Sequence, residues 1–355
     1  MRNRRMLAVI GTTALAVILG ACSSGGSASS SAGNGTSGTG ASTGTITTLD
    51  IGEVPFYANM ALALGEKVGI FAHYGLNVVL QPASNVNVII ANLHSGHQQL
   101  GFVTTPLLLK ADEAGQSVKC VAPLGVANNV NPAYPQNAVM VAKNSTITSL
   151  AQLAGKTVGL NQLAGSNELY LQAGVQQAGG NFSSVHLATV PFADIPAALK
   201  SGTIQAGFEV QPFITSGEQA GDQKLLADLD PLTSPWTTQC YAATTSYLSA
   251  NTALMTRFAQ AQSQAILYAQ AHPADALGEI ATVSGLTAAA AKASTPPKIE
   301  YTNDLQPASL IKYADFMKKY NALTGPTLTQ DQVAWVAPGE PATKLLFAAG
   351  GKYTG

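Results

Sequence analysis

The residue types that could do chemistry in this chain do not combine into a catalytic or metal-binding pattern. His94 and His97 flank a Ser-Gly pair with a spacing that a metal site could use, but no carboxylate or cysteine lies nearby, so a turn is the favoured interpretation. Gly155-Lys156-Thr157 matches the end of a phosphate-binding loop, yet Leu150 stands where such a loop requires a glycine. We therefore predict no catalytic residue, no metal site and no cofactor.

The placement of carboxylates and arginines bears on the charge of a ligand. Glu53, Glu168 and Glu209 lie within or beside segments rich in polar and aromatic residues. A carboxylate there would suit a cationic or donor-rich ligand, whereas solvation or pairing inside the protein is the alternative for Glu209. Because no arginine occurs between Arg5 and Arg257, a guanidinium clamp on an anionic ligand is not expected.

The first 45 residues have the pattern of an export signal followed by a tether. Three arginines within residues 2–5 precede an apolar stretch at 6–19 that is too short to span a bilayer. Residues 19–22, Leu-Gly-Ala-Cys, resemble the lipobox of bacterial lipoproteins. That resemblance implies cleavage after residue 21 and lipidation of Cys22, and an ordinary signal peptide is the alternative. Residues 23–45 contain only Ser, Gly, Ala, Thr and Asn and are expected to form a flexible linker.

The remaining residues, 46–355, are enough for two lobes. A hydrophobic content of 46% supplies sizeable cores, and no later apolar stretch reaches membrane-spanning length. Without the signal peptide, 15 Lys and Arg face 19 Asp and Glu, and this net charge of −4 argues against a nucleic-acid partner. Cys120 and Cys240 are an even pair in an oxidising compartment, so either a disulfide or two buried thiols is expected.

One sequence pattern occurs twice, 106 residues apart. Residues 93–106 and 199–212 share L-x-S-G-x-x-Q-x-G-F-x-x-x-P. Each copy follows a strand-like segment and contains a short helix, which Ser84 or Asp194 could cap, then a glycine and a second buried strand. The repeat therefore predicts two lobes that each contain a parallel strand–helix–strand unit, with chance similarity as the alternative.

Hydrophobic periodicity predicts the other elements of an α/β protein. Strands are expected at residues 45–51, 76–80, 118–124, 138–142, 157–160, 185–190 and 241–247. Helices are expected at residues 58–67 and 167–179, and through most of the chain after residue 251. The C-terminal helices are expected to pack on the first lobe, so that the chain crosses between the lobes near residues 125–131 and 228–250.

Six short segments match one protein family in their order and spacing: Ala61–Phe71, Tyr74–Val78, Ser95–Phe102, Gly115–Lys119, Ser149–Gly159 and Pro212-Phe213. On these segments the chain resembles the ABC-transporter substrate-binding proteins of the nitrate, sulfonate and taurine type, relatives of which bind pyrimidine precursors of thiamine. The resemblance implies an α/β, type II periplasmic-binding-protein fold with two lobes, a ligand cleft and two crossover strands. It implies a first lobe at 46–127, a second lobe at 128–245 and a helical return to the first lobe at 246–355.

The resemblance also implies a ligand site at loops after strands and at helix N-termini, in line with the general rule for open parallel sheets. The expected ligand contacts are Phe56, Tyr57, Asn59, Ser84, Asn85, Asn87, Thr104, Thr105, Asn128, Ser166, Asn167, Glu209, Gln211 and Phe213. The structural alternatives are helix caps for Ser84 and Asn167, and core packing for Phe56 and Phe213.

The function that follows from the resemblance is capture of a small polar solute by lobe closure and its delivery to the membrane permease of an ABC importer. The solute is expected to be sulfonate-, nitrate- or taurine-like, or aminopyrimidine-like, and the protein is expected to be an extracytoplasmic, lipid-anchored monomer. Two alternatives stay open: a surface-anchored sensor, and an enzyme on the same fold that acts on a pyrimidine-like molecule.

Overall fold

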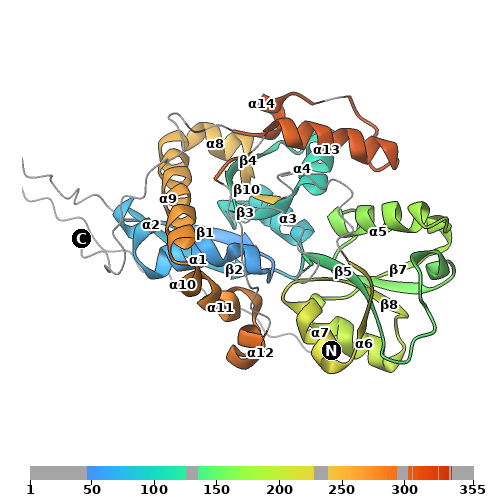
Figure 1. The fold of residues 1–355 in the computed structure, drawn as a ribbon. Helices are drawn as coiled ribbons and strands as arrows, with labels where there is room; N and C mark the ends of the chain where they lie inside the picture. Colours follow the sequence, from blue (N-terminus) through green and yellow to red (C-terminus); the bar gives the residue numbers. More distant parts are fainter. Residues whose placement is uncertain are drawn as a thin grey trace, which may run out of the picture. The chain divides into compact units, whose positions relative to one another are not determined.

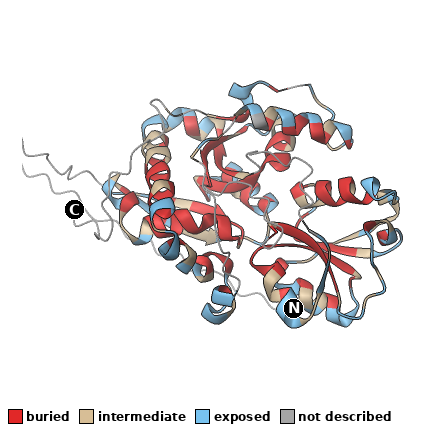
Figure 2. Cartoon of the chain, viewed as in Figure 1, coloured by how far each residue is buried: buried red, intermediate tan, exposed pale blue. Residues whose placement is uncertain are grey.

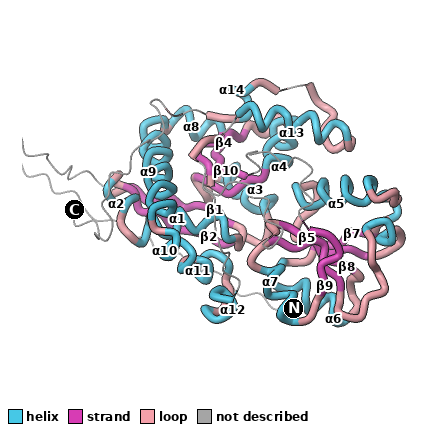
Figure 3. Tube along the Cα trace, viewed as in Figure 1, coloured by secondary structure: helices cyan, strands magenta, loops and turns pink. Residues whose placement is uncertain are grey.

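Two five-stranded sheets with flanking helices form the described part of the chain (Figure 1). The computed structural model describes residues 46–124, 135–227, 239–293, 303–305, 307–326, 328–335 and 337. Strands and helices alternate through the first half of this region, as Figure 3 shows. No described helix is both long enough and apolar enough to cross a bilayer.

The first sheet has the strand order β2-β1-β3-β10-β4. Its strands are β1 (Thr47–Glu53), β2 (Leu76–Pro82), β3 (Leu100–Thr104), β4 (Val118–Pro123) and β10 (Gln239–Thr244). Strand β1 pairs in parallel with β2 and β3, whereas β10 runs antiparallel between β3 and β4. A late segment of the chain is thus inserted into a sheet that is otherwise made from its beginning.

The second sheet repeats this order as β7-β6-β8-β5-β9. Its strands are β5 (Asn137–Val141), β6 (Thr157–Leu160), β7 (His186–Thr189), β8 (Ala206–Val210) and β9 (Gln223–Ala227). Strand β6 pairs in parallel with β7 and β8, and β5 runs antiparallel between β8 and β9. The sequence predicted each of these strands except β9.

Helices cover both sheets, and the two helices predicted at 58–67 and 167–179 have bounds within two residues of the prediction when η1 and α1 are taken together. The 3₁₀ helices are η1 (Tyr57–Asn59), η2 (Leu150–Leu153), η3 (Phe182–Ser184) and η4 (Phe192–Asp194). The α-helices of the first half are α1 (Met60–Lys67), α2 (Ile70–His73), α3 (Val86–Ser95), α4 (Thr105–Glu113), α5 (Ser166–Gln177), α6 (Ile195–Ser201) and α7 (Phe213–Ala220). Those of the second half are α8 (Thr245–Ala250), α9 (Thr252–Ala271), α10 (Pro273–Gly278), α11 (Ile280–Ser284), α12 (Ala288–Ala293), α13 (Pro307–Lys319) and α14 (Gln330–Val333).

The repeated pattern is a structural repeat, because its two copies make the same contacts. A Cβ on Gly101 would lie 2.2 Å from Ile89 Cγ2, and a Cβ on Gly207 would lie 2.3 Å from Ile195 Cγ2. Glycine is therefore required where α3 packs on β3 and where α6 packs on β8.

The repeated glutamines also have one role. The side-chain oxygen of Gln99 accepts the Asp50 N–H at 2.8 Å, and that of Gln205 accepts the Thr157 N–H at 3.0 Å. Each glutamine joins the start of the third strand of its unit to the central strand, so the shared residues fix the same register twice.

Three local predictions are wrong. The N-cap of α3 is Asn85, whose Oδ1 accepts the Val88 N–H at 3.2 Å, and not Ser84. Asp194 precedes α6 with helical dihedral angles and its side chain makes no capping hydrogen bond. The strand expected at 241–247 ends at Thr244, because the Thr244 side chain accepts the Tyr247 N–H and starts α8.

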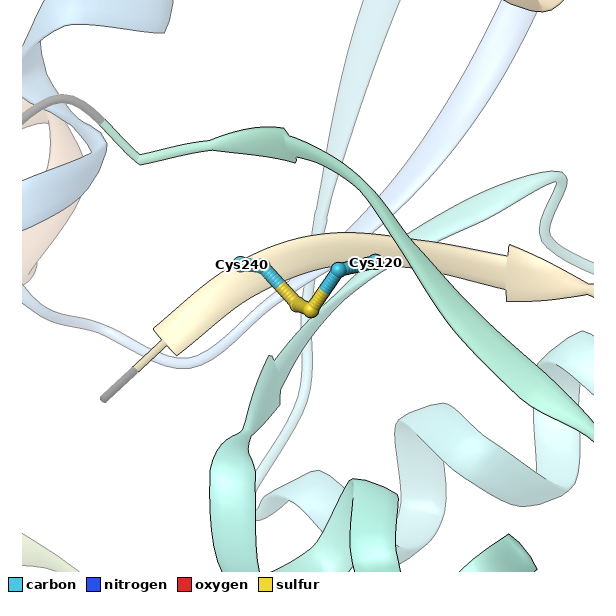
Figure 4. The surroundings of a disulfide bond; sticks show 2 residues. All are labelled: Cys120 and Cys240. Carbon is cyan, nitrogen blue, oxygen red and sulfur yellow. A yellow bond between two sulfur atoms is a disulfide. The ribbon is translucent and has the colours of Figure 1, made fainter. Parts of the chain in front are cut away.

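The division of the chain between the lobes also needs a correction at its second boundary. The prediction assigned residues 128–245 to the second lobe, but β10 pairs with β3 and β4 of the first sheet. Cys240 on β10 and Cys120 on β4 form a disulfide with Cα atoms 5.6 Å apart (Figure 4). The two segments that connect the sheets, 125–134 and 228–238, lie outside the described residues.

The core of the first lobe includes the C-terminal helices. Helix α9 packs on α1, and Phe258 of α9 stacks on Phe71 with ring centroids 6.0 Å apart. Figure 2 shows the inner sides of these helices and the central strands as buried. Helix α13 packs on α4, and the residue after it, Tyr320, accepts a hydrogen bond from the Gln172 side chain of the second lobe through its carbonyl at 3.1 Å.

Candidate functional site

A cavity of about 40 Å³ lies between residues of the two sheets. The first lobe lines it with Val54, Phe56, Val86, Phe102, Thr104 and Gln239, and the second lobe lines it with Asn161, Gln162, Ser166, Asn167, Phe192 and Val210. Four predicted contacts are among these residues: Phe56, Thr104, Ser166 and Asn167. None of the twelve lining residues is ionisable.

The topology explains why these residues meet. Val54 follows β1, Thr104 ends β3, Asn161 follows β6 and Val210 ends β8. All four strands are parallel within their sheet, so their carboxyl ends share an edge where ligands bind in open α/β sheets. The cavity lies where the carboxyl edges of the two sheets face each other.

Two buried hydroxyl groups, one from each lobe, line the cavity. Thr104 and Ser166 are each only 5% exposed, and neither Thr104 Oγ1 nor Ser166 Oγ has a hydrogen-bond partner among the described residues. An unpaired buried hydroxyl costs free energy that a ligand could recover. Ser166 also begins α5, so its hydroxyl lies at a helix N-terminus.

Aromatic rings provide the apolar part of the cavity. Phe56 and Phe102 contact each other edge to face with centroids 6.1 Å apart. On the other side, Phe192 lines the cavity and stacks on Phe213 at 5.6 Å. Phe213 is buried and does not line the cavity, so it lies behind the Phe192 ring as seen from the cavity.

A direct hydrogen bond joins the lobes at this cavity. The Val86 N–H, the first of helix α3, donates to Gln162 Oε1 of the second lobe at 3.0 Å. Gln162 is 3% exposed, and its amide packs so closely on Gly165 that a Cβ there would lie 2.3 Å from Gln162 Nε2. Beside it, Asn167 Nδ2 donates to Asn161 Oδ1 at 2.9 Å.

A buried polar group lies directly behind the first-lobe wall of the cavity. Tyr241 pairs with Phe102, and Gln239 pairs with Thr104, so these four side chains lie on one face of the first sheet. By the register of β1 against β3, the side chain of Glu53, the last residue of β1, lies on the same face. The Asn59 side chain donates to the Val54 carbonyl at 3.2 Å and accepts the Tyr241 hydroxyl at 3.1 Å. Asn59 thus joins Val54 to Tyr241 through hydrogen bonds and is not one of the residues that line the cavity.

Glu53 is the carboxylate on this buried face of the first sheet. It is 4% exposed, and its Oε2 has no hydrogen-bond partner in the described part of the chain. Burial raises the pKa of Glu53 to about 7, although a hydrogen bond with the Asn59 side chain opposes the shift. The nearby Glu53 carboxyl adds to burial in raising the pKa of Tyr241 well above its usual range.

Glu209 lies inside the second lobe and not in the cavity lining. It is 1% exposed, and neither carboxyl oxygen has a partner among the described residues. Burial, assisted by the charge of Asp222, raises its pKa well above the ordinary value. Gln211, also buried, accepts the Thr215 hydroxyl at 3.1 Å and thereby holds the first turn of α7.

The other predicted contacts lie elsewhere or outside the described residues. Tyr57 packs under Phe56 and is buried, and Thr105 is the buried first residue of α4. Ser84 and Asn87 are exposed, and Asn87 lines a separate surface groove between α3 and α4. Asn128 and Cys22 lie outside the described residues.

Sequence reasoning missed most of the second-lobe wall. Asn161 and Gln162 directly follow the strand predicted at 157–160, so the carboxyl-end rule alone could have found them. Phe192 and Gln239 gave no such signal, because one lies in a 3₁₀ helix and the other on a strand contributed by the far half of the chain. Within the described ranges, no three Cys, His, Asp or Glu side chains gather as a metal site.

Residues 58–276, which are more than half of the chain, match the family model described as NMT1/THI5 like. The chain belongs to the NMT1/THI5-like family. No curated protein matches the sequence.

Solved structures show which fold this member of the family adopts. The chain is similar to the periplasmic aliphatic sulphonate binding protein SsuA from Escherichia coli, with a TM-score of 0.60 and 23% identity over 86% of this chain and 97% of that one. It is similar to the alkanesulfonate-binding protein SsuA from Xanthomonas axonopodis pv. citri bound to MOPS, with a TM-score of 0.66 and 20% identity over 83% and 100%.

A third similar structure is the periplasmic nitrate-binding protein NrtA from Synechocystis PCC 6803, with a TM-score of 0.63 and 14% identity over 81% of this chain and 86% of that one. These likenesses confirm the predicted α/β periplasmic-binding-protein fold with two lobes. The desulfurization enzyme DSZB has a related fold, with a TM-score of 0.57 and 14% identity over 81% of this chain and 96% of that one, so the fold alone does not separate binding from catalysis.

Proposed function

We propose that this protein is the extracytoplasmic solute-binding component of an ABC importer. The observation that carries the proposal is a cavity at the facing carboxyl edges of the two sheets, lined by both lobes and bridged by the Val86–Gln162 hydrogen bond. A ligand held by both lobes stabilises the closed arrangement over an open one, which is how a hinged binding protein signals occupancy. The fold shared with the sulfonate- and nitrate-binding proteins supports this function.

The chemistry of the lining favours binding over catalysis. Hydroxyl, amide and aromatic groups surround the cavity, and the twelve lining residues include no cysteine, histidine or carboxylate. An enzyme on this fold would need a nucleophile, a general base or a metal at the ligand. A cavity of about 40 Å³ admits only a few water molecules, so an organic solute enters when the lobes move apart.

The proposal includes the solute class and the anchor predicted from the sequence. The solute is a small polar molecule, and the sulfonate-, nitrate- or taurine-like class and the aminopyrimidine-like class expected from the sequence are the alternatives that the ligand panel below separates. Lipidation of Cys22 holds the mature protein at the outer face of the cell membrane, where the linker at 23–45 lets it reach a permease. Substitution of Cys22→Ala should release the protein into the medium and abolish uptake without changing ligand affinity.

Ligand binding is tested on a soluble protein that comprises residues 46–355. A thermal-shift panel of sulfonates, nitrate, zwitterions, aminopyrimidines and uncharged amides should contain a ligand that raises the melting temperature, since a ligand at 100 times its dissociation constant stabilises by about 2.7 kcal/mol. Ser166→Ala and Thr104→Val should each weaken that ligand by about tenfold, because each removes one buried hydrogen-bonding group.

The matched control is Ser183→Ala, which removes an exposed hydroxyl of the second lobe that donates to Asn181 Oδ1 at 2.7 Å. It should leave the affinity unchanged. Turnover of a panel compound without stable binding would contradict the binding-protein assignment.

A further inference from the structure

Two helix N-termini lie at the cavity, and the protein itself supplies an acceptor to the first N–H of α3 and a carboxylate to the first turn of α5. At α3, the first N–H of the helix, from Val86, donates to Gln162 Oε1, and the N–H of Val88 donates to Asn85 Oδ1. At α5, the carboxylate of Glu168 lies in the first turn, where its Oε2 accepts the Ala164 N–H at 2.6 Å. Helix starts are the usual places for an oxyanion in a cavity without cationic side chains.

Among the described residues that line the cavity, none has a cationic side chain that could replace these donors. None of the lining residues is charged. The two segments that join the lobes carry no Lys, Arg or His, since the sequence has none between Lys119 and Lys143 or between Lys224 and Arg257. An oxyanion bound at the start of α3 would therefore have to displace Gln162 from the Val86 N–H.

We propose that Gln162 is a specificity-determining residue that excludes oxyanions, and that the site takes uncharged polar solutes. The inference rests on the proposed function, because it concerns the ligand of the same cavity. Gln162 contributes an amide oxygen that satisfies the α3 N-terminus without adding a charge, and its fit against Gly165 holds the side chain in place. A neutral solute can then bond the unpaired hydroxyls of Thr104 and Ser166 without displacing it.

The inference reverses the expectation drawn from structural likeness. The similar SsuA and NrtA structures are named for sulfonate and nitrate binding, whereas in this chain Gln162 occupies the first N–H of α3, one of the groups that could hold such an anion. Removing the amide oxygen should therefore create oxyanion binding where the wild type has little.

The test measures ethanesulfonate and nitrate binding to residues 46–355 by isothermal titration, with NMR titration for weak binding. Gln162→Ala should bind ethanesulfonate about tenfold to hundredfold more tightly than the wild type, which is the effect of one hydrogen bond to a charged group. Gln162→Met keeps the length of the side chain but loses the amide. It should show a gain in the same direction, and it replaces Gln162→Ala if the smaller alanine side chain harms folding. Gln162→Glu keeps an acceptor at the helix start and should show no gain.

The matched control is Gln152→Ala. Gln152 also accepts backbone N–H groups at a helix start, from Thr148 at 2.7 Å and Ser149 at 3.1 Å, but it lies outside the cavity lining. The inference is overturned if the wild type binds ethanesulfonate as tightly as Gln162→Ala, or if Gln162→Ala and Gln162→Met gain no more than Gln152→Ala.

Failure of the inference and failure of the proposed function give different outcomes. Tight sulfonate binding by the wild type would support a binding protein while removing the role of Gln162. Conversely, a gain in Gln162→Ala together with no ligand of any class for the wild type would support the role of Gln162 and count against the binding-protein assignment.

Discussion

Replacing Glu53 by glutamine should make the protein more stable at alkaline pH and remove one source of its pH dependence. Glu53 is 4% exposed behind the cavity wall, one of its carboxyl oxygens is unpaired among the described residues, and its pKa is raised from 4.5 to about 7. The folded protein therefore binds this proton more tightly than the unfolded chain does. The stability that the group contributes is complete below pH 4.5 and is lost as the pH rises through 7.

The size of the effect follows from the two pKa values. A shift from 4.5 to about 7 corresponds to about 3.4 kcal/mol at full ionisation. Between pH 5 and pH 8, the loss assigned to Glu53 is about 2.5 kcal/mol. Glutamine keeps the shape of the side chain and a hydrogen bond to Asn59 but cannot ionise, so the variant avoids this loss.

The assay is urea denaturation of the wild type and Glu53→Gln at pH 5 and pH 8. Burial also raises the pKa of Glu209, but the contributions of other buried acids are common to the two proteins and cancel in the difference between them. That difference should shift in favour of the variant by about 2.5 kcal/mol between the two pH values. The half-exposed Glu218→Gln serves as a control for loss of a surface carboxylate.

One result would refute the reasoning. If the difference between Glu53→Gln and the wild type changed by less than about 0.5 kcal/mol from pH 5 to pH 8, the carboxyl would not be desolvated in the folded protein. The position of Glu53 beside Phe102 and Tyr241, read from strand register, would then be wrong as well.

Two further predictions concern the covalent and packing constraints. The double variant Cys120→Ser and Cys240→Ser should lose up to about 5 kcal/mol of unfolding free energy, because the disulfide closes a loop with a sequence separation of 120. Guanidinium denaturation with and without reductant measures the loss. Equal stability of the oxidised and the reduced wild type would contradict this prediction. Gly207→Ala should destabilise the second lobe by about 1–3 kcal/mol, because its Cβ would lie 2.3 Å from Ile195 Cγ2. The cost should be smaller in an Ile195→Ala background, and a double-mutant cycle with no coupling would show that this contact is not the cause.

Local sequence signals determined most of the secondary structure. Residues 157–160 form a strand as predicted, the strand predicted at 118–124 spans 118–123, and the glycines at 96 and 202 end their helices in the left-handed conformation. These features depend on periodicity and on the freedom of glycine to adopt positive φ, both of which are properties of neighbouring residues. The repeat also predicted two similar lobes, because one pattern requires the same strand–helix packing wherever it occurs.

Helix starts were less predictable than helix ends. Ser84 and Asn85 are both good capping residues and adjacent in sequence, yet only Asn85 accepts the Val88 N–H. The sequence did not predict strand β9, or that residues 245–247 are helical, for a related reason. Short segments carry little periodicity, and packing against a sheet decides their conformation.

The sequence by itself determined that two α/β lobes would present polar and aromatic residues at strand ends, and Phe56, Thr104, Ser166 and Asn167 do line the cavity. Only the tertiary structure decided which candidates face the ligand and which are buried behind it, because burial depends on elements from distant parts of the chain. The insertion of β10 between β3 and β4 brings Gln239 to the cavity and Tyr241 to Asn59. The bond from Val86 to Gln162 likewise joins residues 76 positions apart, and no local pattern encodes a contact between two lobes.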